Sequence, residues 1–222
     1  MNSRIFQSIA AKACIALGLI YIVAFMYYGL FWSFPHEHSA ELVMVFYQEQ
    51  ALSFTLISLL MYTFFACVLV LTALGLYQRL YQGAEALTCV ATVFALIWAA
   101  LLIATGFIAQ IGLRTVLDIS HTDAEQALDL WRILSTLIES LGGGNELVGG
   151  LWGVLISLAA LRAKLFTKAL NYLGLFVGVA GIATLYPAQV LTEIFGISQI
   201  IWFIWLGLAM HKPMPTIVQG ER

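Results

Sequence analysis

The sequence predicts an all-α membrane protein, a single domain over residues 1–222 built as a bundle of six transmembrane helices. The chain is 62% hydrophobic and 10% charged, whereas soluble domains are about 45–50% apolar and about 25% charged. Its apolar residues fall into continuous runs rather than the alternating pattern of barrel strands. Lipid is therefore the solvent for most of the chain, and helices satisfy the backbone hydrogen bonds there.

Six apolar runs reach the length of roughly 20 residues that a membrane-spanning helix needs. The fourth run is mixed, because Gly142, Gly143 and Gly144 are poor helix formers in succession. They favour either a break within a helix or a loop, and in the loop interpretation a surface helix over about 123–141 precedes the true span. The expected spans are 11–34, 51–77, 86–113, 133–161, 169–186 and 191–210.

Lysine and arginine predict the orientation, since they concentrate on the cytoplasmic side of membrane proteins. With six spans and a cytoplasmic N-terminus, eight of the ten basic residues lie inside, and Arg114 and Arg132 lie outside. Both termini are then cytoplasmic. The eight are Arg4, Lys12, Arg79, Arg162, Lys164, Lys168, Lys212 and Arg222.

Polar side chains gather in the outer half of the predicted bundle, at depths counted as 1.5 Å per residue. A charge in hydrocarbon costs at least a few kcal/mol, so Glu146 is expected to face the bundle interior or water, with Arg114 as its counter-charge. The alternative is that these groups satisfy one another or reach the nearby interface. The residues of this predicted pocket are Gln110, Arg114, Asn145, Glu146, Tyr186 and Glu193.

Two stripes of small residues predict close packing of the fourth and fifth spans. Gly149 and Gly153 lie four apart on the fourth span, and Gly174 and Gly178 repeat that spacing on the fifth. Small residues at this spacing let helix backbones approach closely in a membrane.

Histidines and acidic residues in two outer loops suggest a divalent metal site. His36, His38 and Glu41 follow the first span, and His121 and Asp123 follow the third. Imidazole and carboxylate groups from the two loops could share one ion. No enzyme or nucleotide motif is present, so no organic cofactor is expected. The net charge is -2 and the sequence has no basic run, so no nucleic-acid partner is expected.

The C-terminal third carries two glycine-containing apolar segments, KALNYLGLFVGVAGIATLYP and FGISQIIWFIWLGLAM. These segments resemble the end of an uncharacterised bacterial family of six-span membrane proteins, known only as a domain of unknown function (DUF4386-like). The resemblance implies a bacterial inner membrane and six spans. It brings no activity and no functional residues.

Three functions follow as hypotheses, with the lipid bilayer as the common partner. The first is a protein that binds or transports a cation, a small polar solute or a lipid headgroup through an outward-facing pocket. The second is a structural or assembly partner whose glycine stripes bind another membrane protein or a second copy. The third is a metal-dependent membrane enzyme that uses the outer-loop histidines and acidic residues.

Overall fold

The computed structural model describes residues 3–31, 39–186 and 188–212. These residues form helices and turns, with no strand among them, which confirms the all-α prediction for this part of the chain. Five helical segments are long and apolar enough to cross a membrane by length and composition. They are Ser3–Phe31, Ala51–Leu80, Glu85–Ser120, Ala124–Arg162 and Gln189–Met210.

Two of these segments contain π-helical turns. The first begins as α1 and ends in η1, and the second joins α3, η2 and α4. In chain order the elements are α1 (Ser3–Met26), η1 (Tyr27–Phe31), α2 (Ala40–Glu49), α3 (Ala51–Ser58), η2 (Leu59–Phe64), α4 (Phe65–Leu80), α5 (Glu85–Ser120), α6 (Ala124–Arg162), α7 (Lys168–Ala183) and α8 (Gln189–Met210).

The expected span at 169–186 corresponds to α7, which is shorter than the others. Its 16 residues extend over about 24 Å, less than the roughly 30 Å of a bilayer core. Thr167 caps its first turn by accepting a hydrogen bond from the Leu170 amide at 3.3 Å. The preceding turn holds Lys164 and Phe166 at positive φ, and the Asn171 side chain supports it by donating to the Leu165 carbonyl at 3.0 Å.

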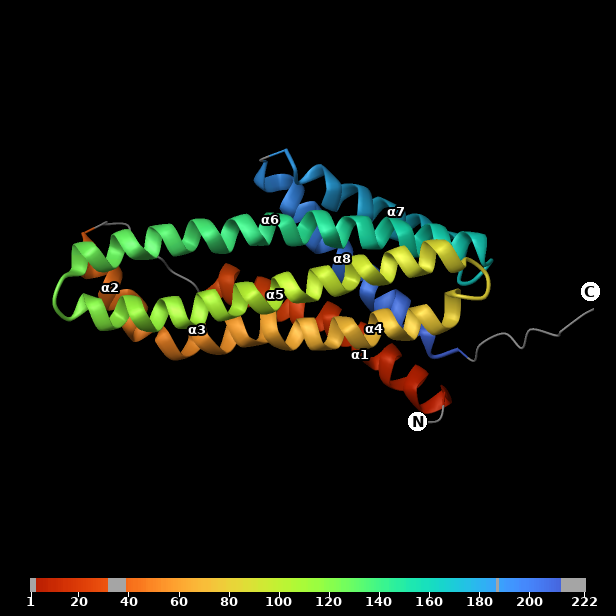
Figure 1. The fold of residues 1–222 in the computed structure, drawn as a ribbon, viewed down its shortest axis with the longest axis horizontal. Coiled ribbons are helices and arrows are strands. Elements are labelled where there is room, and N and C mark those ends of the chain that lie inside the picture. Colours follow the sequence, from red (N-terminus) through yellow and green to blue (C-terminus); the bar gives the residue numbers. More distant parts are fainter. Residues whose placement is uncertain (1–2, 32–38, 187, 213–222) are drawn as a thin grey trace, which may run out of the picture.

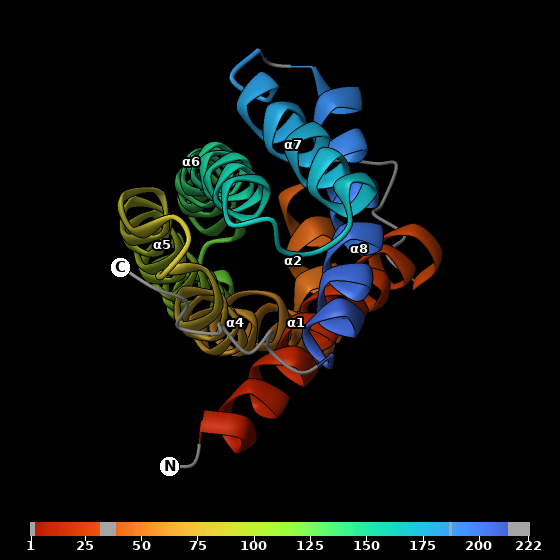
Figure 2. The same ribbon diagram turned by 90° about the vertical axis from the view of Figure 1, so that its right-hand side faces the viewer.

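Six helices form a closed ring in the order α1, α4, α5, α6, α7, α8, with α8 returning to α1 (Figure 2). Each neighbouring pair in this order is in contact. The α1–α8 contact closes the ring between the two ends of the chain, and Cys14 of α1 donates to the Phe203 carbonyl of α8 at 3.3 Å. Inside the ring, the core contains aromatic side chains in tilted contacts with one another, including Phe65, Trp98 and Trp152.

The α5–α6 hairpin projects well beyond the rest of the bundle (Figure 1). With 36 and 39 residues, these helices measure about 54 and 58 Å, almost twice the thickness of a bilayer core. The far end of the α5–α6 hairpin packs against α2 around a separate apolar cluster. This cluster is centred on Trp131, whose ring centroid lies 4.8 Å from that of Tyr47. We call this unit, α2 with residues 113–134, the arm.

The predicted break at Gly142–Gly144 is absent, because α6 runs through these residues without interruption. Each glycine costs near 1 kcal/mol in a helix relative to alanine. On each side of the glycines, however, α6 continues for 18 residues, and it packs against α5, α2 and α7. Because helix formation is cooperative, these flanking segments keep the three glycines helical. The fourth expected span, 133–161, is thus part of one long helix, Ala124–Arg162.

Glycines bring α6 and α7 into backbone contact. A Cβ on Gly150 would lie 2.7 Å from the Gly178 carbonyl oxygen and 2.7 Å from the Ile182 amide nitrogen. Gly153, Gly174 and Gly178 share this interface. Gly149 does not; it faces α5, where a Cβ would lie 3.0 Å from the Trp98 ring. Interfaces of this kind are typical of membrane helices.

The end of the bundle opposite the arm is held by Arg79 of α4. Its Nε donates to Gln7 Oε1 at 2.6 Å, and its Nη2 donates to the Met210 and Lys212 carbonyls at the end of α8. The guanidinium therefore ties together α1, α4 and α8, and its positive charge complements the C-terminal end of the α8 dipole.

Replacing this guanidinium should loosen the three-helix junction. We expect Arg79→Ala to lower the free energy of unfolding by about 2 kcal/mol, the cost of losing hydrogen bonds to a charged donor. Thermal unfolding in detergent checks this, with Arg162→Ala as the control because Arg162 is exposed. Equal melting temperatures for the two variants would contradict the role given to Arg79.

Candidate functional site

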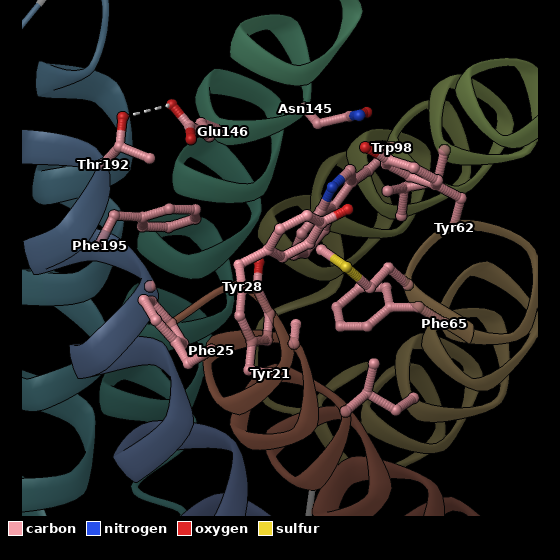
Figure 3. Close-up of a pocket in the computed structure, with 15 residues that line it drawn as sticks. Tyr21, Phe25, Tyr28, Tyr62, Phe65, Trp98, Asn145, Glu146, Thr192 and Phe195 are labelled. Atoms are coloured by element: carbon pink, nitrogen blue, oxygen red, sulfur yellow. Dashed lines mark hydrogen bonds between the residues drawn. The ribbon is translucent and has the colours of Figure 1, made fainter. Parts of the chain in front are cut away.

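A cavity of about 300 Å³ lies inside the ring, toward the arm. It is lined by residues of α1, η1, η2, α4, α5, α6 and α8 (Figure 3). This volume is at the lower end of the range for small-molecule sites. The lining is mainly aromatic and aliphatic, and its aromatic members are Tyr21, Phe25, Tyr28, Tyr62, Phe65, Trp98 and Phe195.

Polar groups enter this cavity from α6 and α8. Glu146 is half-buried, and its Oε2 accepts a hydrogen bond from Thr192 Oγ1 at 3.4 Å. Asn145 is 6% exposed, and its Oδ1 has no hydrogen-bond partner among the described residues. Figure 3 shows the two side chains diverging, Glu146 toward Thr192 and Asn145 toward Trp98 and Tyr62.

Glycines set the shape of the cavity wall. Because Gly149 has no side chain, the Trp98 ring lies directly against α6, one turn below Asn145. Gly181 of α7 similarly leaves room for the Phe195 ring and for the Glu146 backbone, each within 2.8 Å of where its Cβ would stand. Close helix packing therefore positions both the aromatic wall and the carboxylate.

Glu146 lacks a cationic partner in the described part of the chain. The salt bridge found among the described residues joins Arg132 to Asp129 on the arm, with an N–O distance of 3.0 Å. A carboxylate that is half-buried among aromatic rings, without a counter-charge, favours a positively charged or hydrogen-bond-donating ligand. Aromatic faces add attraction for a cation.

Two of the six residues of the predicted pocket line this cavity, namely Asn145 and Glu146. Gln110 and Arg114 do not, because α5 continues to Ser120 instead of ending near residue 113. Counted from the hairpin turn, Arg114 lies about 24 Å closer to the arm tip than Glu146, and it is exposed. It is therefore not the counter-charge of Glu146.

Glu193 and Tyr186 lie near the α7–α8 turn but outside the cavity lining. Glu193 is exposed and accepts a hydrogen bond from Gln189 Nε2 at 3.1 Å. Tyr186 is 73% exposed.

The residues of the predicted metal site are only partly described. His36 and His38 lie outside the described residues. Glu41 is exposed on α2, and His121 follows α5, while Asp123 caps α6 by accepting from the Gln126 amide at 2.9 Å. Across residues 3–31, 39–186 and 188–212, no group of three or more His, Cys, Asp or Glu side chains could hold a metal ion.

Sequence reasoning missed the aromatic wall, although a signal for it was present. Tyr21, Phe25 and Tyr28 follow one another at spacings of four and three, which places them on one face of a helix. Tyr62 and Phe65 repeat the spacing of three. In an apolar chain such a stripe is hard to distinguish from ordinary core packing.

The chain matches no protein-family model, no curated protein and no solved structure in comparisons with known proteins.

Proposed function

We propose that this protein spans a bacterial inner membrane six times, with both termini in the cytoplasm, and binds an amphipathic amine or other organic cation in the aromatic cavity. We also propose that the chain is related to the DUF4386-like family, which its C-terminal third resembles. The ring of six helices and the excess of lysine and arginine on one side support this topology. Although α7 is short, flanking residues can extend a span.

One observation carries the binding function: the Glu146 carboxylate stands at one end of a cavity whose walls are aromatic. An ammonium group would donate a charge-assisted hydrogen bond to the Glu146 carboxylate and gain cation–π attraction from the rings. The apolar part of the ligand would form van der Waals contacts with the cavity walls. An anion would meet repulsion from Glu146, and a strongly polar solute would lose hydration without enough hydrogen-bonding partners.

Octylamine is a suitable probe, with octanol and octanoate as neutral and anionic counterparts of the same length. We expect Glu146→Gln to lower octylamine affinity roughly 10- to 100-fold, because it removes a hydrogen bond to a charged group and leaves the shape intact. Glu146→Leu should lower it at least as much. The measurement is isothermal titration calorimetry in lipid nanodiscs, with the heat of empty nanodiscs subtracted.

Glu193→Gln is the matched control, since Glu193 lies one residue from Thr192 on α8 but outside the cavity. It should leave octylamine affinity unchanged. Equal binding of octylamine and octanoate, or equal effects of the Glu146 and Glu193 substitutions, would remove the basis for this function.

A further inference from the structure

Gln199, halfway along α8, is a buried amide with no hydrogen-bond partner in the described part of the chain. It is 0% exposed, and neither its Oε1 nor its Nε2 forms a hydrogen bond with any described residue. It lies about 15 Å from the start of α8, near the middle of the helix. Water and headgroups are distant at that depth, so an unpaired amide is especially unfavourable there.

Gln7, another buried glutamine of the ring, has hydrogen-bond partners for both ends of its amide. Gln7 is 5% exposed, and its Nε2 donates to the Gly75 carbonyl and to Gln78 Oε1, each at 3.0 Å. Its Oε1 accepts from Arg79 Nε at 2.6 Å. Both ends of that amide are thus satisfied within the protein, whereas neither end of Gln199 has a partner among the described residues.

Gln199 points in the same direction as the α8 residues that line the cavity. It follows Thr192 by seven residues and Phe195 by four, spacings that share one face of a helix. Gln199 therefore lies one turn deeper than Phe195 and about 10 Å deeper than Thr192, the residue that bonds to Glu146.

Further unpartnered polar groups lie on α6, and one of them, Trp152, packs against α8 residues one turn beyond Gln199. Trp152 Nε1 and Ser157 Oγ of α6 are buried and have no hydrogen-bond partner in the described part of the chain. The Trp152 ring packs 5.4 Å from Trp202 and 6.0 Å from Phe203, the α8 residues just after Gln199. Since buried polar groups are normally paired, this group beneath the cavity calls for an explanation.

We propose that Gln199, which lies one turn below the α8 residues of the cavity lining and outside that lining, forms a second, deeper polar site, and that the ligand is bifunctional. Its ammonium group binds Glu146, its neutral hydroxyl group binds Gln199, and an apolar chain along the aromatic walls joins the two. A hydroxyl fits because it accepts from the amide Nε2 and donates to Oε1, which satisfies both free ends. This inference rests on the proposed amine-binding function and specifies its ligand class.

The test compares two series of probes of graded chain length, unbranched alkylamines and the ω-amino alcohols with the same carbon count. At the length that reaches Gln199, the hydroxyl should raise affinity for the wild-type protein about ten- to thirtyfold, the usual effect of two hydrogen bonds between neutral groups. Gln199→Leu should abolish that gain, so that the alkylamine and the amino alcohol of the same length bind this variant with equal affinity. Ser198→Ala is the matched control, because Ser198 is buried but already donates to the Phe195 carbonyl at 3.1 Å.

The ligand-free protein gives a second readout. Gln199→Leu should raise its melting temperature by about 2–4 °C, because leucine removes an unpaired amide of similar size. A lower melting temperature would mean that the amide is paired without ligand, and this would overturn the inference. So would a hydroxyl gain that is absent at every chain length, or one that survives in Gln199→Leu. If neither series binds the wild-type protein, the proposed function itself fails.

Discussion

Gly150→Ala is expected to force α6 away from α7 and to lower the free energy of unfolding by about 3 kcal/mol. The new methyl group would stand 2.7 Å from the Gly178 carbonyl oxygen and from the Ile182 amide nitrogen, and 2.9 Å from the Gly181 carbonyl carbon. All three neighbours are backbone atoms of α7, so no side-chain rotation relieves the overlap. The helices themselves must separate.

Gly153→Ala supplies a matched control three residues along the same interface. Its methyl group would lie 3.4 Å from the Gly178 Cα and 3.6 Å from the Gly174 carbonyl oxygen, which are ordinary contacts. Alanine also favours the helix by near 1 kcal/mol relative to glycine. We therefore expect Gly153→Ala to melt at or slightly above the wild-type temperature in detergent. Similar destabilisation by both variants would show that the α6–α7 backbone contact is not as close as Gly150 indicates.

Trp131→Ala should unfold the arm while leaving the ring of helices intact. The Trp131 side chain is 6% exposed and contacts the Tyr47 ring at 4.8 Å and the Phe54 ring at 5.8 Å. Removing a buried tryptophan costs about 3–5 kcal/mol. The arm's apolar cluster is small and separate from the main core, so it has little to compensate for this loss.

Hydrogen exchange of backbone amides measures this local effect. In Trp131→Ala, the amides of α2 should exchange much faster, while those of α7 and α8 keep their protection. Ile133→Ala, two residues away at a side chain that is 61% exposed, should leave both regions unchanged. Faster exchange throughout the molecule would mean that the arm and the ring unfold as one unit.

The sequence predicted the helices better than it predicted where they end. Hydropathy locates the edge of the apolar stretch, and it placed the end of the third span near residue 113. The helix itself continues to Ser120, since Arg114 and Asp118 are compatible with a helix outside lipid. A depth counted from residue 113 predicts Gln110 and Arg114 at the level of Glu146.

Two further features could not be derived from local pattern. Helix α2 lies in a segment expected to be a loop, and it is stabilised by Ser39, which caps it, and by Tyr47, which packs on Trp131 of the distant α6. The cavity combines residues from seven elements, so its aromatic wall emerges only when the ring closes. Glu146 and Asn145 were found because charge and amide groups are rare in apolar segments.

Ring closure between α1 and α8 also bears on how the molecule is made. Cys14 and Phe203, which meet in that contact, are 189 residues apart. At the usual pace of translation, the ribosome needs roughly ten to forty seconds to extend the chain from one to the other. During that interval α1 has no contact with α8, and the cavity lacks the part of its wall that α8 supplies. A nascent chain that stalls before α8 therefore lacks Thr192, Phe195 and Gly196, and the cavity wall is complete only after α8 has been made.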